Sequence, residues 1–91
     1  MFNLYRVWNR DYKIIDLFAP TPAEAIDRAV GAKHIRRAAT YKKITDCTSI
    51  DERALEHPAL FAAARSAKIS GVATFDRDAG WSIDGKLVAA E

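Results

Sequence analysis

The sequence predicts a single α+β domain in which helices pack on one face of an antiparallel sheet. Segments dense in aromatic and β-branched residues lie near both ends of the chain, as strands require. Two helix-start signals lie between them, and Asp84-Gly85 favours a tight hairpin turn. The 91 residues, 49% of them apolar, suffice for one core and one domain over residues 1–91. The expected order of elements is ββα-β-α(α)-βββ.

The first two strands are predicted to form a hairpin. Residues 2–8 and 12–18 are rich in aromatic and β-branched side chains, and Asn9-Arg10-Asp11 between them is typical of a turn. Both strands carry apolar side chains on both faces. We therefore expect both faces to be covered at least in part, one by helices and the other by a partner.

The first helix is predicted over residues 22–32. Thr21-Pro22-Ala23-Glu24 matches a capping box with proline at the first helical position. In this motif the Glu24 carboxylate accepts a hydrogen bond from the N–H of Thr21. Gly31 lies where the helix is expected to end. The apolar residues that recur at helical spacing are Ala25, Ile26, Ala29 and Val30.

The middle of the chain predicts a third strand and two short helices. The strand covers residues 38–45, where an imperfect alternation leaves the register open. Ser49-Ile50-Asp51-Glu52 matches a second capping box, and Pro58 divides the following helical segment into residues 50–56 and 58–68. The expected buried residues of these helices are Leu55, Leu60, Phe61, Ala64 and Ala67. Three strands, at residues 72–75, 81–83 and 86–89, complete the chain.

Positive charge is concentrated in one segment. Residues 28–43 contain no acidic side chain and six basic ones, which are Arg28, Lys33, Arg36, Arg37, Lys42 and Lys43. Residues 1–43 have a net charge of +5 and residues 44–91 a net charge of −3, which together give the +2 of the whole chain. A small domain with this polarity has one face suited to an anionic partner.

No pattern in the sequence indicates a catalytic, metal or cofactor site. His34, Cys47 and His57 lie 13 and 10 residues apart, which matches no zinc-binding spacing, and Cys47 has no adjacent base. Asp76 and Asp78 are typical of a turn, and the four glycines form no phosphate-binding loop. We therefore predict a protein that is not an enzyme and needs no cofactor or metal. A Cys47-dependent enzyme is kept as a third hypothesis.

The cysteine content and the distribution of apolar residues predict the cellular compartment of the protein. The single cysteine cannot form an internal disulfide, and the first ten residues do not resemble a secretory leader. No apolar run approaches the length of a membrane span. We expect a cytoplasmic protein that does not bind membranes.

The chain resembles other small proteins in its opening segment and in its size. Tyr5-Arg6-Val7-Trp8, followed by Ala19-Pro20-Thr21-Pro22-Ala23-Glu24-Ala25-Ile26, resembles a strand–strand–helix opening found in many unrelated small domains. In size and in lacking a catalytic motif, the chain is similar in type to accessory proteins of phages and mobile elements, including anti-CRISPR inhibitors. This similarity is one of scale, and it implies a protein that acts by binding.

We predict a small interaction module, of the adaptor or inhibitor type, that binds an acidic protein surface. The expected contact residues are Lys33, Arg36, Arg37, Tyr41, Lys42 and Lys43. Pairing along an exposed strand edge is a second mode of binding, and Trp8 or Trp81 could supply an apolar anchor. The alternative function is a nucleic-acid-binding domain that uses residues 28–43. Homodimerisation is also left open.

Overall fold

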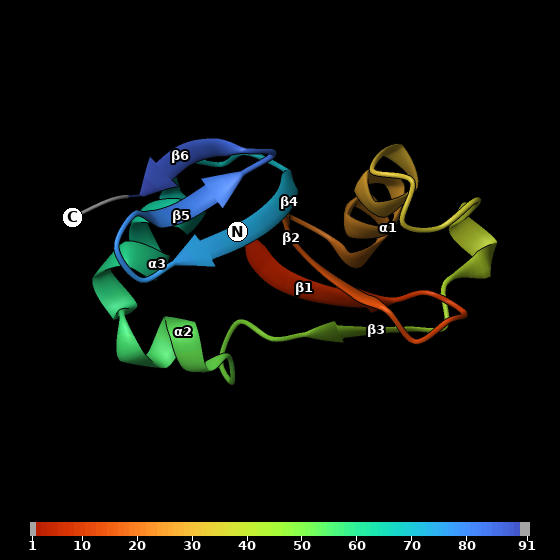
Figure 1. Cartoon of the computed structure of the whole chain (residues 1–91), viewed down its shortest axis with the longest axis horizontal. Coiled ribbons are helices and arrows are strands. Elements are labelled where there is room, and N and C mark those ends of the chain that lie inside the picture. The colour runs from red at the N-terminus through yellow and green to blue at the C-terminus, as the bar shows by residue number, and fades with distance from the viewer. Residues whose placement is uncertain (1, 90–91) are drawn as a thin grey trace.

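The computed structural model describes residues 2–89, which form a six-stranded antiparallel sheet and three α-helices (Figure 1). The strands are β1 (Asn3–Trp8), β2 (Ile14–Ala19), β3 (Lys43–Asp46), β4 (Gly71–Asp76), β5 (Gly80–Ile83) and β6 (Lys86–Ala89). The helices are α1 (Pro22–Gly31), α2 (Glu52–Glu56) and α3 (Pro58–Ser66), with a 3-10 turn, η1 (Ala38–Thr40). The strands lie in the order β3-β1-β2-β4-β5-β6. The predicted α+β class, antiparallel sheet and order of elements are confirmed.

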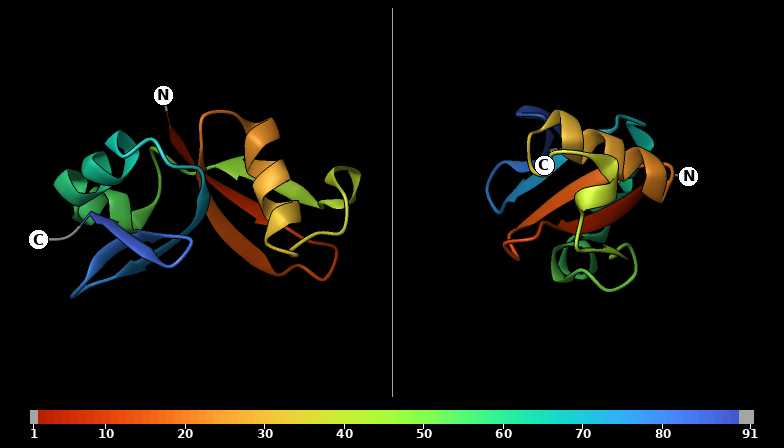
Figure 2. Two further views of the ribbon diagram at one scale, coloured as in Figure 1. Left: turned by 90° about the horizontal axis from the view of Figure 1, so that it is seen from above. Right: turned by 90° about the vertical axis from the view of Figure 1, so that its right-hand side faces the viewer.

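The helices lie over the two halves of the sheet, with α1 over one half and α2 and α3 over the other (Figure 2). α1 packs against the face of β1 and β2 that carries Val7 and Leu17. α3 packs against the face that carries Phe18, where its Phe61 ring lies 5.8 Å from the Phe18 ring and 5.7 Å from the Trp81 ring. Because neighbouring residues of a strand point to opposite faces, β2 is covered on both. α1 and α3 therefore lie on opposite faces of β2, and not on one face of the sheet as predicted. α3 covers the face that we had expected a partner to cover.

The predicted hairpin is confirmed, with β2 beginning at Ile14. Trp8 pairs with Ile14 next to the turn that closes the hairpin. The Asn9 side-chain oxygen accepts hydrogen bonds from the N–H groups of Asp11 at 2.9 Å and Lys13 at 3.0 Å, so this one side chain fixes the turn. Tyr12 completes the turn with a positive φ of 60°.

The prediction of a strand over residues 38–45 is wrong in its first part. Residues 38–40 form η1, and β3 begins only at Lys43. The Thr40 hydroxyl donates to the Arg37 carbonyl at 2.8 Å and accepts from the Arg37 N–H at 3.2 Å. These local hydrogen bonds satisfy backbone groups that a strand would have paired with β1.

α2 begins later than the predicted capping box implies. Asp51, and not Ser49, is the N-cap, because its carboxylate accepts from the N–H groups of Arg53 at 2.9 Å and Ala54 at 3.4 Å. Ala54 then faces the core and its neighbour Leu55 is 65% exposed, so the predicted burial of Leu55 is wrong. Of the other predicted buried residues, Phe61 and Ala64 are buried, and Leu60 and Ala67 are half-buried.

α1 agrees with the prediction at its start and differs at its end. The Thr21 hydroxyl accepts from the Glu24 N–H at 3.2 Å, as a capping box requires. The Glu24 carboxylate accepts from the hydroxyl of Ser70 and makes no bond to Thr21 within residues 2–89. The helix ends at Gly31, but Lys33 and not the glycine takes the left-handed conformation, with φ of 61°.

Candidate basic binding surface

Three segments meet at one end of the molecule. They are the β1–β2 turn, the chain that leaves α1, and η1 (Figure 1). Between them lies a hollow of about 570 Å³, which we call the basic recess. Its lining consists of Asn9, Arg10, Asp11, Lys33, His34, Ile35, Arg36, Arg37 and Thr40. The lining of the recess therefore contains four cationic residues and one acidic residue.

The end of α1 determines where Lys33 lies. The Lys33 N–H donates to the Val30 carbonyl at 2.9 Å, and the His34 N–H donates to the Ala29 carbonyl at 3.0 Å. With Lys33 in the left-handed conformation, these two bonds form a Schellman motif. Glycine is the preferred residue at this position because it has no Cβ to clash. The chain instead places a lysine here, at the edge of the recess.

Two residues hold the following loop against the sheet. His34 Nε2 lies 2.9 Å from the Val7 carbonyl oxygen, and because a carbonyl only accepts, this nitrogen carries the proton. Ile35 is 5% exposed and packs with Val7 and Ala29. Arg36 and Arg37, which follow, are exposed. The loop backbone is thus anchored while its two guanidinium groups face solvent.

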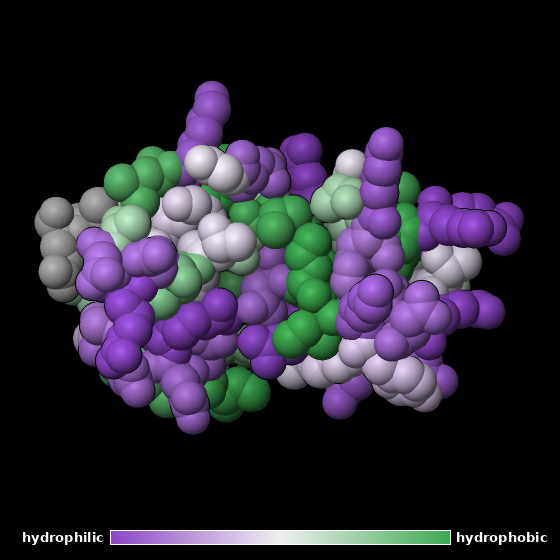
Figure 3. Space-filling model, viewed as in Figure 1, coloured by the Kyte–Doolittle hydropathy of each residue, from purple (hydrophilic) through white to green (hydrophobic). Residues whose placement is uncertain are grey.

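Internal carboxylates do not neutralise the recess. Among residues 2–89, every ion pair within 4.0 Å joins Arg6 or Arg53 to Asp16 or Asp51. None of these pairs includes a cation of the recess. Hydrophilic side chains project from this end of the molecule in Figure 3. The charges of the recess are therefore available to a ligand.

A second, smaller hollow of about 330 Å³ adjoins the recess and is lined by Arg10, Tyr41 and Lys42. The Lys42 N–H donates to the Trp8 carbonyl at 2.8 Å, which holds this segment beside β1. The Lys42 Nζ lies 5.5 Å from the centre of the Tyr12 ring, and the Lys43 Nζ lies 5.0 Å from the centre of the Trp8 ring. We call Trp8, Tyr12, Tyr41, Lys42 and Lys43 the aromatic–lysine rim.

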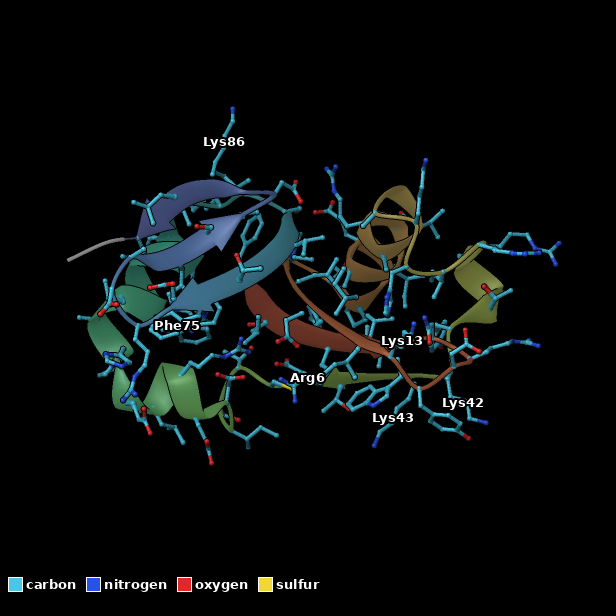
Figure 4. The ribbon with its side chains drawn as sticks, viewed as in Figure 1. Arg6, Lys13, Lys42, Lys43, Phe75 and Lys86 are labelled. Atoms are coloured by element: carbon cyan, nitrogen blue, oxygen red, sulfur yellow. The ribbon has the colours of Figure 1, made fainter. Side chains whose placement is uncertain are left out.

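Figure 4 shows the same grouping of charges. Lys13, Lys42 and Lys43 lie around the end of the β1–β2 hairpin, whereas Lys86 projects from the other half of the molecule. Tyr12 stands out in the rim because its side chain is 68% exposed and its backbone has a positive φ. An aromatic residue in this conformation is strained, and its exposed ring contributes little to the core. The physical requirements of folding do not explain a tyrosine at this position.

The structure brings the predicted contact residues together at one end of the molecule. Lys33, Arg36 and Arg37 line the recess, and Tyr41, Lys42 and Lys43 belong to the rim. Arg28 belongs to the same basic segment but does not line the recess.

Arg10, which lines both hollows, and Tyr12 were not among the predicted contact residues. The signal for Arg10 was its place in the hairpin turn, two residues after Trp8. A third strand paired with β1 brings the basic segment to that turn. Trp81 is fully buried and cannot act as an exposed anchor, whereas Trp8 is half-buried.

Cys47 lies in an environment that does not activate it. It is 5% exposed, and burial raises the pKa of its thiol, although the charge of Arg6 opposes this rise. A raised pKa disfavours the thiolate, which is the nucleophilic form. The two histidines are engaged elsewhere, since His34 bonds to the Val7 carbonyl and the His57 ring packs 5.3 Å from the Phe75 ring.

The Asp76 side chain stabilises the turn in which it lies. Its carboxylate accepts from the N–H groups of Asp78 at 2.8 Å and Ala79 at 3.0 Å, and these bonds lower the pKa of Asp76. Across residues 2–89, no three His, Cys, Asp or Glu side chains come together as a metal site would require. Nor does any helix in that range have the length and apolar character needed to cross a membrane.

Comparisons of the chain with protein-family models, with curated proteins and with solved structures found no match.

Proposed function

We propose that the protein is a non-enzymatic interaction module, of the adaptor or inhibitor type, that binds an acidic surface of a partner protein. The observation that carries this proposal is the grouping of unpaired cations around one recess at one end of the molecule. Grouped cations without internal partners create a positive potential that attracts and orients an acidic surface. We place this action in the cytoplasm, where a free cysteine such as Cys47 persists.

The recess and the rim contribute different interactions. Arg10, Arg36 and Arg37 carry guanidinium groups, which bind carboxylates with two parallel hydrogen bonds. The exposed ring of Tyr12 supplies apolar contact area at low cost in side-chain entropy, as is common at the centre of protein interfaces. β3, an edge strand of the sheet, adjoins this surface and offers a second mode of attachment by strand pairing.

A second candidate function is the binding of single-stranded nucleic acid. The observation that favours it is the exposure of Tyr12 (68%) and Tyr41 (41%) beside Lys42. Unpaired bases stack on exposed aromatic rings while neighbouring cations neutralise phosphates. This candidate predicts a steep loss of affinity with added salt.

The test compares two double charge reversals. Arg36→Glu/Arg37→Glu acts in the recess, and Lys68→Glu/Lys86→Glu changes the net charge equally on exposed positions away from it. Binding of fluorescent acidic peptides and of single- and double-stranded oligonucleotides is measured by anisotropy across a salt series. We expect the recess variant to lose binding of the acidic peptide and the control variant to retain it.

Equal affinities of the two variants would contradict the proposed surface, because net charge alone would then determine binding. Binding of the single-stranded oligonucleotide in preference to the acidic peptide, with a loss in the recess variant, would support the second candidate in place of the first.

A further inference from the structure

We propose that the basic recess takes a phosphate monoester, so that the group recognised on the partner is a phosphorylated side chain. This inference rests on the proposed function, since it names the chemical group that the acidic partner presents. The charge of the recess lining points to this group. The lining contains four cations, Arg10, Lys33, Arg36 and Arg37, and one carboxylate, that of Asp11, which leaves a net charge of +3. A phosphate monoester at neutral pH carries about −1.5 to −2, against −1 for a carboxylate.

The types of cation also favour phosphate. Three of the four are arginines, whose planar guanidinium groups match the oxygens of a phosphate with paired hydrogen bonds. They come from two separate segments, because Arg10 lies in the β1–β2 turn and Arg36 and Arg37 lie in the loop after α1. Cations that approach from two sides can contact different oxygens of one phosphate group.

The recess is preorganised by bonds that no ligand has to form. The Asn9 side chain fixes the turn that carries Arg10. His34 ties the other wall to the Val7 carbonyl, and the Thr40 hydroxyl holds Arg37 through two hydrogen bonds. A backbone held in this way loses little entropy when a ligand binds.

Lys33 and Lys68 offer a matched pair of positions for a controlled substitution. Lys33 occupies a left-handed position that favours glycine, and Lys68 occupies the corresponding position after α3, with φ of 54°. The two lysines have the same local conformation, but only Lys33 lines the basic recess. Replacing either one by glycine relieves backbone strain, whereas only Lys33→Gly removes a charge from the recess.

A diester backbone fits the recess less well than a monoester. Each phosphate of a nucleic acid carries one negative charge, and binding depends on many cations spread along the strand. The recess instead collects its charge within a hollow of about 570 Å³. The test therefore compares binding of a phosphate monoester, in a phosphoserine peptide, with binding of a phosphate diester, in an oligonucleotide.

The experiment uses the full chain and three peptides that differ only at one central residue, which is phosphoserine, glutamate or serine within an acidic sequence. Isothermal titration calorimetry gives the affinities for the wild type, Lys33→Gly and Lys68→Gly, and urea unfolding gives their stabilities. We expect the phosphoserine peptide to bind the wild type at least about tenfold more tightly than the glutamate peptide. Lys33→Gly should lose most of this preference, while Lys68→Gly keeps it and both variants unfold at the wild-type urea midpoint or above it.

The outcomes separate this inference from the proposed function. Equal affinities for the phosphoserine and glutamate peptides would overturn the phosphate inference and leave the proposed function standing. If no acidic peptide binds, the proposed function fails. A stabilising shift of the unfolding temperature by inorganic phosphate, compared with chloride at equal ionic strength and lost in Lys33→Gly, would then still support the recess as a phosphate site. A single-stranded oligonucleotide that binds more tightly than the phosphoserine peptide would overturn the monoester assignment.

Discussion

Replacing Arg53 by methionine removes the guanidinium group that links α2 to the sheet. Arg53 donates to Asp51 through Nε at 3.0 Å and through Nη2 at 2.8 Å, and Nη2 also lies 2.8 Å from Asp16 Oδ2. The guanidinium lies 5.0 Å from the centre of the buried Trp81 ring. Methionine retains an unbranched apolar side chain over that ring, so the substitution tests the charge and its hydrogen bonds.

The expected loss of stability follows from the burial of the carboxylates. The side chains of Asp51 and Asp16 are only 6% and 12% exposed, so loss of Arg53 leaves poorly solvated charges behind. Asp16 keeps its bonds to Arg6, and Asp51 keeps its two backbone donors. Arg53 is itself 29% exposed, which places the cost toward the low end for such pairs, at about 2–3 kcal/mol. This loss is a large part of the total free energy of unfolding, which is roughly 5–14 kcal/mol for a chain of this length.

The loss of stability caused by Arg53→Met should depend on pH, because it involves the carboxyl group of Asp51. Burial alone would raise the pKa of Asp51, but the hydrogen bonds and charge of Arg53 outweigh it and lower the pKa from its ordinary value. A carboxyl whose pKa is lower in the folded than in the unfolded protein stabilises the fold above about pH 4, and this contribution is lost as the pH falls through the folded pKa. The difference in the free energy of unfolding between the wild type and Arg53→Met should therefore be larger at pH 7 than at pH 3.

Urea unfolding followed by circular dichroism and tryptophan fluorescence at both pH values measures this difference. Arg77→Met is the control, because Arg77 is exposed and belongs to none of the ion pairs within residues 2–89. A loss below about 0.5 kcal/mol at pH 7, as is usual for surface substitutions, would show that Arg53 does not stabilise the fold through these carboxylates. So would a loss of equal size at pH 3.

Gly71→Ala is expected to destabilise the fold by about 1–2 kcal/mol, because a Cβ at Gly71 would lie 2.4 Å from Asp84 Oδ2 and displace the carboxylate that accepts from the Val72 N–H. Gly31→Ala meets no atom within 4 Å and should stabilise α1 by up to about 1 kcal/mol. Urea unfolding measures the stabilities of both variants. Equal stabilities of Gly71→Ala and Gly31→Ala would contradict the close packing at Gly71. Cys47 should react with iodoacetamide at neutral pH at least about tenfold more slowly in the folded than in the urea-unfolded protein. Equal rates of alkylation would show that the thiol is accessible.

The parts of the fold that the sequence predicts are those controlled by neighbouring residues. Strand alternation and turn residues place the three hairpins, β1–β2, β4–β5 and β5–β6. Thr21 and Pro58 mark helix starts through short-range bonds and backbone geometry. The start of α2 was misplaced because Ser49 and Asp51 both suit an N-cap, and only the packing of Ala54 into the core selects Asp51. η1 was missed because the Thr40 hydroxyl competes with strand pairing.

The candidate site could be predicted as far as it is continuous in the sequence. The basic segment supplied Lys33, Arg36 and Arg37, since a run of cations is visible without a structure. Arg10 was not found, because its proximity to that segment depends on how the hairpin lies beside α1. The strain at Tyr12 could not be predicted either, since no pattern reveals a positive φ at a tyrosine.

The most direct test of the account is an NMR titration of the ¹⁵N-labelled full chain with the acidic phosphoserine peptide and with its glutamate counterpart. We expect the amide shifts on binding to concentrate at residues 9–13 and 33–43, around the recess and the rim. Shifts centred on β4, β5 and β6, or an absence of shifts with either peptide at low salt, would contradict it.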